Sequence, residues 1–169
     1  MARRWKTKPK KSLRENAQEI IPLLFDEFME TKVRVVGHPR LKDELHGMRL
    51  KGKMLRYIME IAGGFYGPAF GECYEEIRRA VGLMGSIHDC DVQLPVIQQH
   101  VRELRAFNAA VKSDDRIPTA PMVVLHHQHK ERRNTLFNEL CGILLRWEAE
   151  NFRGRILLSM TRATELSQP

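Results

Sequence analysis

The chain has 169 residues, of which 43% are hydrophobic and 29% charged. This size and composition predict one globular domain with a core, and they exclude a wholly disordered chain. No apolar run approaches the ~18 residues of a membrane span, and the basic N-terminus lacks the apolar stretch of a secretory signal. We therefore expect no membrane contact. Three widely spaced cysteines, Cys73, Cys90 and Cys141, form neither a disulfide framework nor a zinc signature, which favours the reducing cytoplasm.

The formal net charge of +7 is concentrated at the N-terminus. Of the 28 lysines and arginines, seven lie in the first 14 residues, which contain no acid, so the remainder carries 21 basic and 21 acidic side chains. We interpret residues 1–11 as a flexible basic tail and residues 12–169 as a single helical domain. The binding properties of that domain must depend on where its charges lie, since their sum is close to zero.

The first predicted helix begins at Ser12, which forms a capping-box pattern with Glu15. Apolar residues then recur at helical spacing, and Pro22 is expected to kink this helix without ending it. Gly37 and Pro39 end the segment. A second helix is predicted over residues 41–62, with an apolar seam formed by Leu41, Leu45, Met48, Gly52, Leu55 and Met59.

Two longer helical segments follow. Residues 69–110 are predicted to be helical, and a cluster of glycine and proline at residues 85–95 marks where this segment could be interrupted. A loop covers residues 112–121, and the last helix runs from residue 121 to about residue 164, with Gly142 and Gly154 as points where it could bend. Strand signals are nearly absent, so the expected fold is all-α, an antiparallel four-helix bundle with long helices.

One face of the second predicted helix is entirely cationic or titratable. At about 100° per residue, five side chains share an arc of about 80°. No acid enters this arc, although ordinary solvated helix faces mix signs because like charges at i,i+4 destabilise a helix. The arc borders the apolar seam and spans about 21 Å, which suits an extended polyanion better than a single phosphate. These residues form the cationic stripe: Lys42, His46, Arg49, Lys53 and Arg56.

A second basic group lies early in the last predicted helix. His126, His129, Lys130 and Arg133 occupy positions i, i+3, i+4 and i+7, so they share one face and could form a wall opposite the cationic stripe. Acidic residues nearby favour an ordinary solvated face over this interpretation. A chance cluster, or an ion-pair partner for acids on neighbouring helices, is likewise the alternative explanation of the cationic stripe.

Two motifs stand out along the chain. Residues 44–57 read ELHGMRLKGKMLRY, with the spacing H-x-x-R-x-x-x-K-x-x-R-Y, and residues 81–92 read VGLMGSIHDCDV. Together they resemble the CHAD family, the conserved-histidine α-helical domains. The resemblance extends from about residue 12 to residue 160 and implies a helical bundle that binds inorganic polyphosphate through a basic surface. It assigns His46, Arg49, Lys53 and Arg56 to that surface, and less directly Arg132 and Arg133. It further implies a protein of the cytoplasm that associates with polyphosphate granules.

Two departures from the family pattern shape the expectations. His88 stands where the family usually has an arginine, which argues against phosphate binding at this position. Asp89 and Asp91 are interpreted as structural acids that orient arginines. The signature histidine motif occurs once, whereas family members commonly contain two related units, so we expect a homodimer.

Other functions are weighed against polyphosphate binding. The chain has no phosphate-binding glycine loop, no G-x-S-x-G and no H-E-x-x-H, so we expect neither catalysis nor a cofactor. The histidines at 126–129 lack a carboxylate or thiol that would complete a metal site. Nucleic-acid binding stays open because phosphate contacts alone do not discriminate, but Tyr57 is the only ring beside the stripe, which favours bare phosphate over bases. An acidic protein partner is the third alternative.

Overall fold

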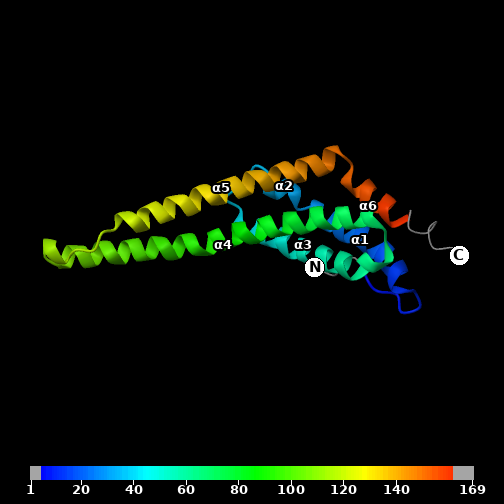
Figure 1. The fold of residues 1–169 in the computed structure, drawn as a ribbon, viewed down its shortest axis with the longest axis horizontal. Helices are drawn as coiled ribbons and strands as arrows, with labels where there is room; N and C mark the ends of the chain where they lie inside the picture. Colours follow the sequence, from blue (N-terminus) through cyan, green and yellow to red (C-terminus); the bar gives the residue numbers. More distant parts are fainter. Residues whose placement is uncertain (1–4, 162–169) are drawn as a thin grey trace.

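The computed structural model describes residues 5–161 of the chain, and every regular element in that range is helical (Figure 1). The all-α prediction is therefore confirmed. In the same range, no helix has the length and apolarity that a membrane span requires. The elements in chain order are α1 (Leu13–Met29), α2 (Lys32–Val35), α3 (Lys42–Ala62), the 3₁₀ turn η1 (Gly63–Phe65), α4 (Pro68–Ala110), the 3₁₀ turn η2 (Ser113–Asp115), α5 (Ala120–Ala149) and α6 (Phe152–Thr161).

The predicted capping box opens α1. The Ser12 hydroxyl accepts from the Glu15 backbone N–H at 3.2 Å, and the Glu15 carboxylate accepts from the Ser12 N–H at 2.7 Å. As expected, Pro22 lies inside α1 and does not end it, since the helix continues to Met29. The predicted apolar positions are buried on its core face: Ile20, Ile21, Leu24, Phe25 and Phe28.

The apolar seam of α3 forms the centre of the core. Leu45, Met48, Leu55 and Met59 are buried, whereas Leu41 lies just before the helix and is 45% exposed. Gly52 marks the closest approach of the neighbouring helices, because a Cβ there would meet side-chain atoms of Phe28, Val81 and Met84 at 2.9 to 3.1 Å. The seam predicted from periodicity is thus confirmed apart from its first residue.

Helix α4 runs without a break for 43 residues, about 65 Å at ~1.5 Å per residue. The interruption considered for residues 85–95 does not occur, and Pro95 lies within the helix. Ile87 and Cys90 are buried before this proline, and Ile97 and Val101 are buried after it. Packing on both sides holds the helix together where local sequence alone would favour a break.

The last helical region is divided at Asn151 rather than at either glycine. Asn151 has a positive φ of 48°, a conformation that asparagine tolerates better than most residues, and it separates α5 from α6. Its side-chain oxygen accepts from the Gly154 N–H at 3.2 Å, which satisfies a donor at the start of α6. Across the break, the rings of Trp147 and Phe152 stack with centroids 4.5 Å apart. The end predicted near residue 164 lies outside the described residues.

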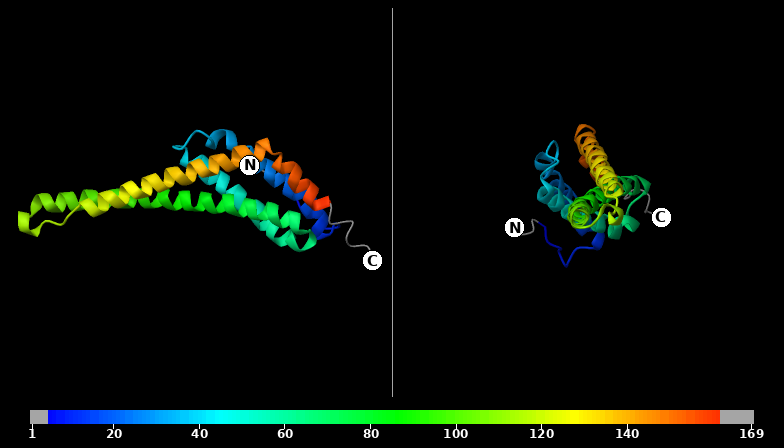
Figure 2. Two further views of the ribbon diagram at one scale, coloured as in Figure 1. Left: turned by 45° about the horizontal axis from the view of Figure 1, so that its top comes forward. Right: turned by 90° about the vertical axis from the view of Figure 1, so that its left-hand side faces the viewer.

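The helices form a thick bundle with a slender extension (Figures 1 and 2). Helices α1, α3 and α6 pack around the first part of α4 and the last part of α5. The distal parts of α4 and α5 continue beyond the bundle as an antiparallel pair, which we call the arm and define as residues 92–130. A separate α6 and a projecting arm are features that the four-helix expectation did not include.

Part of the basic N-terminal segment contacts α1. Asn16 accepts from the Lys8 backbone N–H at 2.7 Å and donates to the carbonyl oxygens of Lys8 and Lys11 at 3.1 and 3.0 Å. The ammonium groups of both lysines pair with Glu19. Residues 8–11 are therefore fastened to the bundle, and residues 1–4 of the predicted tail lie outside the described residues.

Candidate functional site: a pocket between α3 and α4

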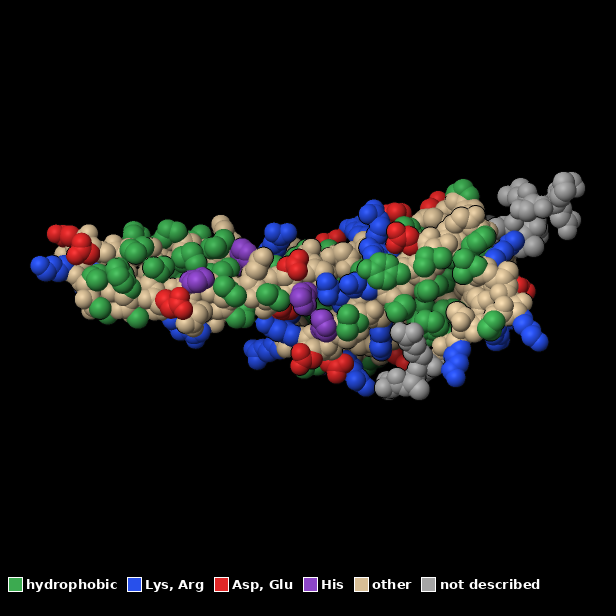
Figure 3. Space-filling view, turned by 90° about the horizontal axis from the view of Figure 1, so that it is seen from below, with side chains coloured by type: hydrophobic (Ala, Val, Ile, Leu, Met, Phe, Trp, Pro, Cys, Tyr) green, Lys and Arg blue, Asp and Glu red, His purple; other side chains and the backbone are tan. Residues whose placement is uncertain are grey.

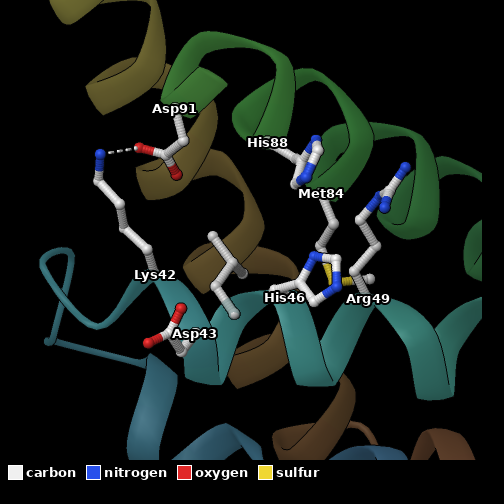
Figure 4. Close-up of a pocket in the computed structure, with 8 residues that line it drawn as sticks. Lys42, Asp43, His46, Arg49, Met84, His88 and Asp91 are labelled. Carbon is white, nitrogen blue, oxygen red and sulfur yellow. Dashed lines mark ion pairs between the residues drawn. The ribbon is translucent and has the colours of Figure 1, made fainter. Parts of the chain in front are cut away.

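A pocket of about 140 Å³ opens between the start of α3 and the middle of α4 (Figure 4). Its floor is apolar, because Leu45 and Met84 are buried beneath it. Polar side chains from both helices surround the opening: Lys42, Asp43, His46 and Arg49 from α3, and His88 and Asp91 from α4. Three of the five stripe residues therefore meet at one site.

Asp91 connects three helices at one end of the pocket. Its carboxylate accepts from the Arg133 guanidinium of α5 at 3.0 and 3.3 Å, in a two-point arrangement, and pairs with the Lys42 ammonium at 3.1 Å. The side chains of Arg133 and Asp91 are only 8% and 11% exposed. Because a buried guanidinium needs a partner, this carboxylate fixes where α5 docks and where Lys42 lies.

Asp89 differs from Asp91 in its surroundings. Its side chain is 70% exposed, and its only ion pair within the described part of the chain is with the His88 ring at 3.7 Å. Of the two acids interpreted as structural, Asp91 therefore holds an arginine and a lysine, and Asp89 holds neither.

Two histidines face one another across the mouth of the pocket. The ring centroids of His46 and His88 are 5.4 Å apart, with the planes tilted by 35° (Figure 4). Nδ1 of His88 is buried and has no hydrogen-bond partner among the described residues. The substitution of His88 for the family's usual arginine had argued against this position as a site residue. The structure places it in the pocket wall, opposite His46.

The other stripe residues continue along α3 beyond the pocket. No ion pair involves Arg49, Lys53 or Arg56 within residues 5–161, so these cations are not neutralised by acids there. The Arg56 guanidinium lies 4.5 Å from the centroid of the Tyr57 ring, and its Nε is buried without a hydrogen-bond partner in the described range. The alternative in which the stripe serves as an ion-pair partner for neighbouring acids applies to Lys42 alone.

The basic group of α5 does not form the opposite wall, which is supplied by α4. Arg133 is buried in the pair with Asp91. His126 lines a separate depression on the arm, and the Nδ1 atom of His129 lies 3.0 Å from the Leu125 carbonyl oxygen. Lys130 and Arg132 are exposed. Helical spacing had grouped these residues correctly on one helix, but it could not show which neighbouring helix faces the cationic stripe.

The chemistry of the pocket is that of an anion site. Burial raises the pKa of the Cys90 thiol, the residue before Asp91, so this cysteine stays protonated and weakly nucleophilic at neutral pH. Within the described ranges, no group of three histidine, cysteine or carboxylate side chains is arranged to hold a metal ion. The donors that remain are ammonium, guanidinium and imidazole groups, which recognise phosphate and carboxylate oxygens.

Fold and site together define an all-α protein in which a pocket between two helices brings two histidines together with lysine and arginine side chains. A family model described as the CHAD domain matches residues 2–98, more than half of the chain, and the chain belongs to this family. CHAD domains are associated in general with polyphosphate binding. No match was found among curated proteins or solved structures. The matched segment contains every pocket residue and ends within the arm, before Arg133.

Proposed function

We propose that this protein binds inorganic polyphosphate, without catalysis, along the cationic stripe and in the pocket where the stripe begins. The observation that carries this proposal is the row formed by Arg49, Lys53 and Arg56, which have no acidic partner within the described residues. Unneutralised cations on one helix face repel one another, and a bound polyanion removes that cost. The length of the stripe, about 21 Å, favours several successive phosphates over one.

The surroundings of the stripe favour bare phosphate over nucleic acid. Base recognition on a single strand needs an exposed aromatic face for stacking. Tyr57 is the ring nearest the stripe, and the Arg56 guanidinium lies over it. A phosphate chain needs no such ring, so the arrangement suits a ligand made of phosphates alone.

The carboxylates near the pocket support binding without catalysis. Metal-assisted phosphate hydrolysis needs carboxylates that are free to hold the metal ion beside the phosphates. Asp91 is engaged by Arg133 and Lys42, and Asp89 is largely exposed beside His88, which leaves Asp43 as the one lining carboxylate without an ion pair in the described structure. Release of orthophosphate from polyphosphate in the presence of Mg²⁺ or Mn²⁺ would contradict this part of the proposal.

The proposal is tested by titrating long-chain polyphosphate and charge-matched single-stranded RNA across a salt series. Arg49→Glu/Arg56→Glu is expected to lose affinity at every salt concentration. It should also flatten the slope of log affinity against log salt by about 1.4, since each contact with a single strand contributes ~0.7. Lys112→Glu/Arg116→Glu at the tip of the arm carries the same change in charge and serves as the matched control.

The basic N-terminal segment needs its own control, because removing it would also remove the α1 cap at Ser12. Replacing Arg3, Arg4, Lys6 and Lys10 with glutamine lowers the charge and keeps the cap. Loss of binding in this variant, together with unchanged binding by Arg49→Glu/Arg56→Glu, would refute the stripe as the site. Tighter binding of RNA than of polyphosphate would instead favour the nucleic-acid alternative.

We further propose that two copies associate through the arm. Val92, Val96 and Phe107 are about half exposed and fall within an arc of about 60° on α4. Figure 3 shows apolar side chains along one side of the arm. These residues span about 22 Å of α4, and with α5 beside it the arm is two helices wide, which gives a flat footprint on the order of 450 Å². Accessible area exceeds a flat footprint, so a self-pairing of arms approaches the ~800 Å² per partner of stable interfaces.

Light scattering at micromolar concentration tests this association. The wild type is expected to have the mass of two chains, and Val96→Lys is expected to shift the mass toward one chain because it places a charge in the contact. Gln98→Lys adds the same charge to another side of α4 and should leave the mass unchanged. A monomeric mass for the wild type would refute the association.

If polyphosphate is the ligand, a fluorescently tagged protein should gather at polyphosphate granules in the cytoplasm.

A further inference from the structure

The fixed charges that line the pocket cancel. Lys42 and Arg49 contribute two cations, and Asp43 and Asp91 contribute two carboxylates. The lining is therefore formally neutral while both imidazoles are neutral, and it becomes positive only when His46 or His88 is protonated. Histidine is the side chain whose charge changes in the physiological pH range. Protonation of the two histidines thus adds the positive charge that strengthens anion binding beside Arg49.

The two rings are close enough to contact one anion together. Their centroids are 5.4 Å apart, and two imidazolium groups at such a distance repel one another unless an anion lies between them. A phosphate group between the rings supplies the opposite charge and stabilises both protonated forms. Nδ1 of His88 has no hydrogen-bond partner within residues 5–161, so no hydrogen bond fixes a neutral tautomer of this ring.

The other charged groups around His88 do not replace the effect that protonation of the two histidines has on the charge of the pocket. On its own helix, the Asp89 carboxylate lies 3.7 Å away and is largely exposed, while Asp91 is shared by Lys42 and Arg133. From α3, the charged residues facing the pocket are the four already named in its wall. From α5, Arg133 shares the Asp91 carboxylate with Lys42, so it adds one cation, which the Asp89 carboxylate offsets, and Arg132 is exposed near Cys90.

We propose that His88 is a ligand of the bound polyanion, and that polyphosphate binding at this pocket takes up protons through the His46–His88 pair. This inference rests on the proposed function and adds a regulation to it. The protein holds polyphosphate tightly at slightly acidic pH and releases it as the pH rises. A histidine in place of the family's usual arginine then exchanges a fixed cation for one that depends on pH.

The test is isothermal titration calorimetry of long-chain polyphosphate at pH 6, 7 and 8, at constant ionic strength and in two buffers of different ionisation enthalpy. Each proton taken up corresponds to about a tenfold change in affinity per pH unit. We expect net proton uptake on binding at pH 7, with an upper limit of one proton for each of the two histidines. The end groups of polyphosphate also titrate, so the uptake measured with His46→Gln/His88→Gln is subtracted.

Three single variants test whether His88 is responsible for the pH dependence of polyphosphate binding. His88→Gln keeps a hydrogen-bonding side chain without the charge, and it is expected to lose affinity at pH 6 and most of the pH dependence. His88→Arg fixes one of the two cations, so it is expected to bind more tightly than the wild type at pH 8 and to lose part of the pH dependence. His127→Gln, on the exposed side of α5, is the matched control and should behave as the wild type does. Circular dichroism confirms that each variant is folded.

The outcomes separate this inference from the proposed function. Wild-type binding with no net proton uptake and the same affinity at pH 6 and pH 8 overturns the inference and leaves the proposed function standing. Undiminished pH dependence in His88→Gln removes His88 from the mechanism and likewise overturns it. No binding of polyphosphate by the wild type at any of the three pH values refutes the proposed function itself.

Discussion

Replacing Asp91 with asparagine is predicted to destabilise the fold strongly. Within residues 5–161, the change removes the only carboxylate paired with Arg133, whose side chain is 8% exposed, and leaves a buried guanidinium without a counter-charge. Breaking such a buried pair by removing one partner costs about 3–5 kcal/mol. The asparagine oxygen can still accept one hydrogen bond from Arg133, so we expect about 3 kcal/mol, near the lower end of that range.

The Asp91 carboxylate also pairs with an exposed lysine, and a comparison of the two pairs tests whether burial causes the loss of stability. Lys42 pairs with Asp91 at 3.1 Å, but its side chain is 51% exposed. Lys42→Met is therefore expected to cost less than about 1 kcal/mol, as is usual for ion pairs at the surface. Replacing both members of the buried pair, as Asp91→Leu/Arg133→Met, should recover much of the stability, because no unpaired charge remains.

Urea unfolding followed by circular dichroism measures these free energies, and the double-mutant cycle gives the coupling between Asp91 and Arg133. Loss of under 1 kcal/mol in Asp91→Asn, or an equal loss in Lys42→Met, would refute the argument from burial. Because Asp91 also contributes a negative charge to the pocket, Asp91→Asn should bind polyphosphate more tightly than the wild type wherever it is folded. Stability and affinity are thus expected to change in opposite directions.

Gly52→Ala is expected to lower the urea midpoint, because its Cβ would meet the Phe28 ring at 2.9 Å and overpacking costs about 1–3 kcal/mol. Gly82→Ala meets nothing within 4 Å and should raise the midpoint through helix propensity; equal shifts would contradict the close approach. A hydrogen bond from Lys11 is the main reason that the pKa of Glu19 lies below its ordinary value of 4.5 in the folded protein. That pairing stabilises the fold above pH 4.5 and is lost as the pH falls below it, so Glu19→Gln should lower the melting temperature at pH 7 and have little effect at pH 3. A similar loss at both pH values would show that the charge is not the cause.

Local sequence determined most of the secondary structure and the residue composition of one wall of the site. The seam of α3 and the cationic stripe beside it follow from spacings of three and four residues, and such spacings place side chains on one helix face whatever surrounds the helix. The capping box at Ser12 and Glu15 is equally local, since both of its hydrogen bonds join residues three apart.

At two places the local sequence favoured one helix boundary and tertiary packing favoured another, and the structure follows the packing. Glycine and proline at residues 85–95 allowed a break, but burial of residues such as Ile87 and Ile97 on either side keeps α4 continuous. The last helical region breaks at Asn151, where a left-handed backbone lets Phe152 stack on Trp147. Hydrophobic periodicity does not predict the break at Asn151, because the stacking joins residues on opposite sides of it.

The sequence by itself determined that this protein is all-helical and that α3 carries a row of cations from Lys42 to Arg56. The tertiary structure alone decided what faces that row, because the opposing wall depends on how α3 and α4 cross. It brought His88 opposite His46, and it turned Arg133 from a candidate ligand into the buried partner of Asp91. Spacing along one helix fixes which side chains share a face, whereas contacts between helices depend on packing among residues far apart in the chain.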